Sequence, residues 1–260
     1  MNMNIKILIL LCVVQGLTEF LPVSSSGHLL LIEQIFGISE NTLLLNLFLH
    51  LASLVAVVIF YRDILKKLLK KPFQPLTYKL IISTAITVVL ALAYEWLKID
   101  AFAEKHYGYF FIATSVLLAI TYFFQKKSVR ICLNDVSYKN SVLVGLVQGI
   151  AVMPGISRSG STISSLVLSG VSEEKSAEYS FLLSIPVIVG GFLFELLKIK
   201  DFSPLVSGLN PLLYLMAFVL TFLVALLSLK ITVKMLKQNK FIYFSVYLLI
   251  LGIVVIFFVK

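Results

Sequence analysis

The sequence predicts an all-α protein that crosses a membrane several times and is built from two related halves. Of its 260 residues, 59% are hydrophobic and only 13% are charged, with a mean hydropathy of +1.00. A soluble domain of this length needs far more polar surface. A Ser-rich motif also occurs twice, 133 positions apart. We therefore expect one integral membrane domain over residues 1–260, with repeats over about 1–130 and about 131–260.

Hydrophobic runs predict the elements in order. Crossing a hydrocarbon core of about 30 Å takes roughly 20 helical residues. Six runs are long enough, near residues 44–61, 80–97, 108–125, 178–197, 211–229 and 241–259. Four shorter runs, 5–21, 28–36, 141–153 and 160–170, flank two breaks rich in Pro, Ser and Gly. At about 1.5 Å per residue, the run 28–36 extends only about 14 Å. Each short pair is therefore predicted to be a re-entrant helical hairpin with a buried or water-lined tip.

Each half then contains one hairpin and three transmembrane helices, and because three is odd the second half is inverted relative to the first. Fifteen Lys and Arg residues lie in the segments 61–79, 125–140, 171–177 and 230–240, against six in the segments on the other side. The positive-inside rule places the fifteen inside, both termini outside and Cys132 inside. The net charge of +9 follows this pattern, so no nucleic-acid partner is expected. The two hairpins enter from opposite sides, and their tips are expected to meet near the midplane.

The repeated motif differs where chemistry is expected. The copies at residues 15–28 and 148–162 read QGLTEFLPVSSSGH and QGIAVMPGISRSGST. Sliding the chain by 133 positions aligns Ser24 with Ser157 and preserves a Gln-Gly pair and a Ser-x-Ser-Gly run. Only the first copy contains Glu19 and His28, and only the second contains Arg158. The complementary acid, base and cation predict a site where the two repeats meet.

Gln15 and Glu19 are four residues apart, so they share one helix face and can point at one ligand. A Glu within a membrane segment is costly and usually functional. The structural alternative is a protonated Glu that bonds to a neighbouring helix.

The Ser24-Ser25-Ser26 run lies where a helix restarts, and capping alone is the competing explanation for Ser24 and Ser26. Ser25 and His28 are three residues apart, within reach for a hydroxyl nucleophile and its general base. A lone membrane His can also be only a satisfied polar residue.

Arg158 follows the second break, where a cation at membrane depth needs an anionic partner. Its planar fork suits two phosphate oxygens, and pairing with Glu19 is the structural alternative. Two helix N-termini are expected at the same place and favour an anion. A phosphate site at membrane depth implies a lipid substrate. Weaker candidates are Glu178 and Ser180 as supporting groups, while His50 and His106 are interpreted as structural and surface-loop residues.

Two motifs carry a resemblance to a known family. Gln15 and Glu19 match (Glu/Gln)-x-x-x-Glu, and Pro154 to Thr162 reproduce Pro-Gly-x-Ser-Arg-Ser-x-x-Thr. The Ser-Ser-x-Gly-His stretch and residues 178–183 are also similar. Over nearly its whole length the chain resembles the bacterial undecaprenyl-diphosphatases of the bacitracin-resistance family, whose inverted-repeat fold with re-entrant hairpins agrees with the architecture above.

The resemblance implies hydrolysis of undecaprenyl diphosphate to undecaprenyl phosphate in the bacterial plasma (inner) membrane, with Mg²⁺ or Ca²⁺ as cofactor. It implies metal or phosphate handling by Glu19 and Gln15, diphosphate binding by Arg158, and nucleophile and base roles for Ser25 and His28. Substrate binding is expected from further polar side chains: Gln15, Ser24, Ser26, Ser157, Ser159 and Thr162. Gln at position 15 removes one carboxylate from the metal pair. Whether Ser25, His28 or a metal-bound water attacks phosphorus stays open, as does a homodimer.

Two rival functions have partial support in the sequence. Ser25 to His28 are similar to the Pro-Ser-Gly-His motif of the type 2 phosphatidic acid phosphatases, but that family needs a His and an Asp where this chain has Ser164 and Leu168. A transporter of the carrier lipid fits the inverted repeat and a midplane site. A Ser–His pair beside an Arg exceeds what lipid binding requires, which favours the enzyme.

Overall fold

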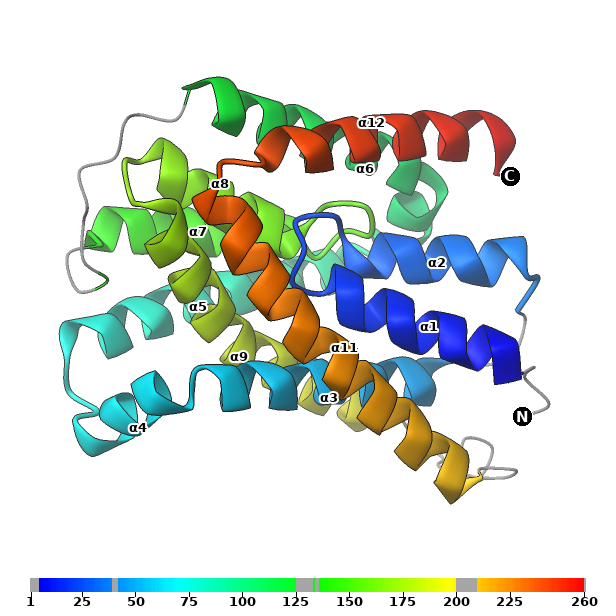
Figure 1. Cartoon of the computed structure of the whole chain (residues 1–260), viewed down its shortest axis with the longest axis horizontal. Helices are drawn as coiled ribbons and strands as arrows, with labels where there is room; N and C mark the ends of the chain where they lie inside the picture. Colours follow the sequence, from blue (N-terminus) through cyan, green and yellow to red (C-terminus); the bar gives the residue numbers. More distant parts are fainter. Residues whose placement is uncertain (1–4, 39–41, 125–132, 134–135, 200–209, 260) are drawn as a thin grey trace.

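The computed structural model describes residues 5–38, 42–124, 133, 136–199 and 210–259, and Figure 1 shows their arrangement. All regular elements in these ranges are helices: α1 (Ile5–Thr18), α2 (Ser25–Ile35), α3 (Leu43–Phe60), α4 (Arg62–Lys70), α5 (Pro75–Trp96), α6 (Asp100–Phe124), α7 (Tyr138–Ile150), α8 (Arg158–Leu168), α9 (Glu173–Lys198), α11 (Pro211–Lys237) and α12 (Phe241–Phe258). Cys132, whose inside location was predicted, lies outside the described residues.

The six predicted membrane spans are confirmed by length and composition. They are α3, α5, α6, α9, α11 and α12, which have 18 to 27 residues each. The chain is therefore a multi-pass membrane protein. Several helices exceed the apolar runs, because Lys and Glu are good helix formers that extend a helix beyond the hydrocarbon core. Thus α11 continues to Lys237, and His106 lies half-buried in α6 rather than in the predicted surface loop.

The four short helices form two pairs around the predicted breaks. The pair α1 and α2 brackets residues 19–24, and the pair α7 and α8 brackets residues 151–157. Figure 1 shows α1 and α2 side by side, with their connecting loop near the centre of the molecule. The α1 helix has 14 residues and α2 has 11, so neither alone spans a bilayer.

Contacts between the two halves hold the bundle together. Helices α6 and α12 approach closely at Gly108 and Gly252, where a Cβ on either glycine would lie within 2.8 Å of an atom of the other helix. On α11, Ser228 donates to the Leu17 carbonyl at 2.6 Å, which fixes the last turn of α1. Small residues and interhelical hydrogen bonds are the usual means of packing helices in lipid. The last turn of α1 leads directly into Glu19.

Candidate active site

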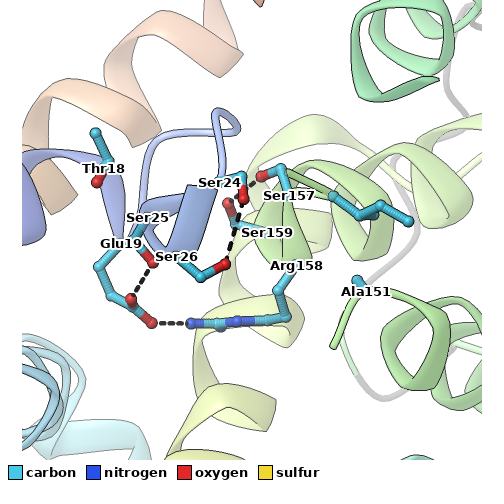
Figure 2. A pocket seen from close by; sticks show the side chains of 10 residues that line it. Thr18, Glu19, Ser24, Ser25, Ser26, Ala151, Ser157, Arg158 and Ser159 are labelled. Atoms are coloured by element: carbon cyan, nitrogen blue, oxygen red, sulfur yellow. Dashed lines mark hydrogen bonds and ion pairs between the residues drawn. The ribbon is translucent and has the colours of Figure 1, made fainter. Parts of the chain in front are cut away.

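The two breaks meet, as the repeated motif predicted. The Gly155 amide donates to Ser24 Oγ at 3.1 Å, and the Ser159 hydroxyl donates to the Leu21 carbonyl at 3.0 Å, so the second break supplies both donors and the first supplies both acceptors. A small cavity of about 40 Å³ lies between them, and its lining comes from both halves: Thr18, Glu19, Ser24, Ser25, Ser26, Ala151, Ile156, Ser157, Arg158 and Ser159 (Figure 2). This volume holds roughly three waters, or one group of similar size.

Ser24 and Ser157 begin the two helices that point into the site. Ser24 Oγ accepts the Gly27 amide at 3.4 Å, and Ser157 Oγ accepts the Gly160 amide at 3.0 Å, so both act as N-caps. The backbones differ, because Ser24 has φ +68° whereas Ser157 has φ −77°. A left-handed conformation at a non-glycine residue costs about 1–3 kcal/mol and is held only by its surroundings. The first break is therefore strained and the second is relaxed.

Two glycines allow the two tips to pack closely. A methyl group on Gly27 would lie 2.6 Å from the Phe111 ring and 2.9 Å from the Gly155 nitrogen. Gly155 has φ +91°, and a Cβ there would lie 2.3 Å from the Tyr107 carbonyl oxygen. Glycine is the residue that both positions permit.

Glu19 is the centre of the polar contacts. Its side chain is buried, and its Oε1 accepts from Arg158 Nη2 at 2.6 Å. Its Oε2 accepts from the Ser25 hydroxyl at 2.8 Å and from Gln15 Nε2 at 3.0 Å. Figure 2 shows Arg158 and Ser25 each reaching a different oxygen of the carboxylate. The buried charge of Glu19 is thus compensated by one cation and two neutral donors.

Arg158 uses one of its two terminal nitrogens to pair with Glu19. The Glu19 pairing that the sequence offered as an alternative is present, but it uses only Nη2. The other terminal nitrogen, Nη1, is buried and has no hydrogen-bond partner among the described residues. A buried unpaired donor costs about 1–3 kcal/mol, which an anion in the cavity would relieve. Pairing with Glu19 and binding of a phosphate oxygen are therefore compatible.

The structure does not join Ser25 with His28. The His28 Nδ1 lies 2.7 Å from the Ser24 carbonyl oxygen, which can only accept, so this nitrogen donates. Its Nε2 lies 2.6 Å from the Tyr247 hydroxyl, and the two rings are stacked. Both ring nitrogens are thus engaged away from Ser25, whose hydroxyl donates to Glu19 instead. His28 holds the strained turn at Ser24, and the proton acceptor in contact with Ser25 is Glu19.

Of the other predicted substrate-binding hydroxyls, that of Ser26 lies at the cavity and that of Thr162 lies outside its lining. Ser26 is exposed at the cavity, with its Oγ 3.5 Å from that of Ser24. Thr162 lies outside the cavity lining, where its Oγ1 donates to the Arg158 carbonyl at 2.9 Å and lies 2.6 Å from Ser180 Oγ. Ser180 therefore supports the first turn of α8, whereas Glu178 pairs with Lys175 at 2.7 Å.

Two neighbours of the site were missed by sequence reasoning. His50 donates from Nδ1 to the Asn46 carbonyl, and its Nε2 lies 3.7 Å from Glu19 Oε2. Tyr247 lies in α12, and its hydroxyl is 2.6 Å from His28 Nε2. For His50 the available signal was a single His within an apolar span, but nothing in its spacing indicates which helix it faces.

The oxygen ligands offered by Gln15 and Glu19 are too few to hold a hard divalent cation on their own. Gln15 Oε1 is buried without a partner among the described residues, and Glu19 supplies a carboxylate one turn later. Within the described ranges, no group of three or more His, Cys, Asp or Glu side chains could hold a metal. Mg²⁺ is commonly held by one or two carboxylates together with substrate phosphates. These residues therefore fit a cation that a phosphate ligand helps to hold.

Comparisons with known proteins agree on one family. The family described as bacitracin resistance protein BacA matches residues 8–254. A protein of Carboxydothermus hydrogenoformans is 35% identical over 95% of each chain, and one of Treponema denticola is 36% identical over 96% of each. A protein of Thermosipho africanus is 38% identical over 96% of this chain and 98% of its own length. All three are called undecaprenyl-diphosphatase.

Proposed function

The chain belongs to the bacitracin resistance protein family, BacA, and we propose on this basis that it hydrolyses undecaprenyl diphosphate to undecaprenyl phosphate and inorganic phosphate. This reaction recycles a carrier lipid for cell-wall synthesis and would confer bacitracin resistance. The observation that carries the proposal is Arg158, which lines a cavity with two helix N-termini and whose Nη1 has no hydrogen-bond partner in the described part of the chain. That arrangement suits a phosphate group.

The contacts of Ser25 support a role as nucleophile with Glu19 as its base. A bond forms between Ser25 Oγ and the terminal phosphorus while the bridging P–O bond breaks, and undecaprenyl phosphate leaves. The Ser25 proton passes to Glu19 Oε2, which already accepts it at 2.8 Å. Water then attacks phosphorus and the Oγ–P bond breaks. Inorganic phosphate leaves with the oxygen and both protons of the water, and the proton held by Glu19 returns to Ser25. Direct attack by water without the phosphoserine intermediate is the competing route.

Arg158 and His28 have supporting roles in this scheme. Arg158 Nη1 would bind an oxygen of the transferred phosphate, while Nη2 keeps the Glu19 carboxylate in place. His28 would orient Ser25 through its bond to the Ser24 carbonyl. We expect Ser26 and the first turns of α2 and α8 to contact the diphosphate. Gln15 and Glu19 would hold Mg²⁺ or Ca²⁺ together with phosphate oxygens, and the bound cation would neutralise diphosphate charge.

The inverted repeat belongs to the same proposal, with both termini on the outer face of the bacterial plasma membrane. Two observations support it. The packing of α5 on α7 has a counterpart in the packing of α11 on α1, which is the pairing expected when the halves exchange places. The fifteen-to-six bias of Lys and Arg also favours this orientation. A homodimer stays a prediction.

Phosphate release by purified protein tests the function. Wild-type protein with Mg²⁺ should release phosphate from undecaprenyl diphosphate, and a chelator should lower the rate. Ser25→Ala should reduce turnover by at least about 100-fold, since an activated nucleophile is lost. The matched control, Ser169→Ala, removes a hydroxyl from the far end of α8, where it bonds only to the Ser165 carbonyl.

The intermediate distinguishes the two routes of attack. Rapid acid quenching of wild-type protein should leave a phosphoserine on the peptide that contains Ser25, detected by mass spectrometry. Turnover without this species, and retained in Ser25→Ala, would indicate direct attack by water. If wild-type protein releases no phosphate with any divalent cation but moves labelled carrier lipid between leaflets, it is a transporter.

A further inference from the structure

The short helix α4 separates basic from apolar side chains. Within Arg62–Lys70, the apolar residues Ile64, Leu65 and Leu68 pack partly buried against the core. The opposite face and the residue that follows the helix contribute five exposed cations: Arg62, Lys66, Lys67, Lys70 and Lys71. The only acidic residue in residues 62–71 is Asp63. In the part of the chain that the structure describes, none of these cations forms an ion pair.

Two large apolar side chains next to the cations contact little protein. Leu69 is 81% exposed at the border of the basic face, and Phe73, just beyond the helix, is 85% exposed. In water this exposure would be unfavourable, whereas the boundary between lipid headgroups and acyl chains accommodates it. The basic side chains then lie at headgroup level.

The position of α4 fits the same surface. Tyr61 lies between α3 and α4 and caps both helices, and its carbonyl accepts from the Ile64 and Leu65 amides at 3.0 Å each. The α4 helix therefore starts where a membrane span stops, and Pro75 begins the next span five residues after Lys70. Figure 1 shows α4 at the end of the bundle, beyond α3.

We propose that α4 is an interfacial helix that binds anionic phospholipid headgroups through Lys66, Lys67, Lys70 and Lys71, with Leu69 and Phe73 inserted at the edge of the acyl chains. The density of positive charge argues for anionic rather than zwitterionic lipid, because each Lys or Arg near a negative membrane surface adds favourable attraction. The inference does not depend on hydrolysis. It concerns a surface on α4 that contributes no residue to the cavity lining.

A single-tryptophan probe tests the proposal. Trp96, the only Trp of the chain, is replaced in a Trp96→Phe, Phe73→Trp variant. The protein is reconstituted in vesicles that contain brominated phosphatidylglycerol or brominated phosphatidylcholine at equal mole fraction. Quenching at position 73 should be about twofold stronger with the anionic lipid, and the preference should decrease as salt rises. Wild-type Trp96, 82% exposed at the opposite end of α5, is the reference.

Charge removal provides the matched control. Adding Lys67→Gln and Lys70→Gln should bring the two lipids to nearly equal quenching. Adding Lys98→Gln and Lys105→Gln, which removes the same charge from exposed residues elsewhere, should leave the preference unchanged. Equal quenching before any Lys is replaced, or no quenching by either lipid, would refute the proposal. Unchanged phosphate release in the variants would show that they are folded.

Discussion

At the scale of single residues, the site depends on the division of contacts between the two oxygens of Glu19. One oxygen accepts from Arg158 and the other accepts from the Ser25 hydroxyl, so one carboxylate contacts both the cation and the proposed nucleophile. The residue identities could be predicted from the sequence, because Glu, His and Arg in membrane segments are costly. Their partners could not. Helical spacing placed Ser25 near His28, whereas Tyr247 lies 219 positions from His28 and accounts for its second nitrogen.

Arg158→Lys should lose most activity although the charge is kept. One ammonium group cannot hold the Glu19 oxygen and reach the phosphate in the geometry of the guanidinium fork. Losing one charge-assisted bond costs about 1.5–3 kcal/mol, which is roughly 10- to 100-fold in kcat/KM. Phosphate release checks the change in activity, and thermal unfolding in detergent checks that the variant is folded. A folded variant with near-wild-type turnover would mean that Arg158 has only a structural role.

At the scale of elements, the hairpins matter because their tips are pressed together. The breaks and the six spans were predictable from hydropathy, since each apolar run has a length that either can or cannot cross lipid. Helix α4 was not predicted as an element. Its mixture of Lys and Leu residues has the mean hydropathy and charge of an inside loop. Nor does the sequence show that Gly27 faces Phe111 and Gly155.

Gly27→Ala should therefore disturb the contact between hairpins. The added methyl group would overlap the Phe111 ring and the Gly155 amide, and overpacking of this kind costs about 1–3 kcal/mol. We expect a lower melting temperature and reduced phosphate release. Gly190→Ala is the control, because a Cβ at that helical position meets nothing within 4 Å. Equal stability of the two variants would show that the first hairpin can move aside.

At the scale of the whole molecule, orientation decides which aqueous phase reaches the cavity. The charge distribution that predicts the orientation is a property of the entire chain. It could be counted from the sequence, whereas the hydrogen bonds from Gly155 to Ser24 and from Ser159 to Leu21 depend on the folded arrangement of both halves.

Cysteine labelling tests this orientation. In a background without Cys12 and Cys132, Lys139→Cys places a thiol at an exposed residue on the predicted inside, and Lys98→Cys places one on the predicted outside. A membrane-impermeant maleimide should label position 98 in intact spheroplasts and position 139 only in inverted vesicles. The reverse pattern would invert the topology.

The contrast between Ser24 and Ser157 shows how two copies of one motif take different parts in the site. Both serines cap a helix at the same place in the repeat, yet only Ser24 has a left-handed backbone, and it precedes the proposed nucleophile. The copy with the ordinary backbone contributes the cation and a rigid surface, including the Gly155 amide that binds Ser24 Oγ. One copy therefore carries the proposed nucleophile, and the other supplies contacts that hold it in place. Exchanging residues between the copies would therefore not be neutral, even though the differing residues occupy equivalent positions of one motif.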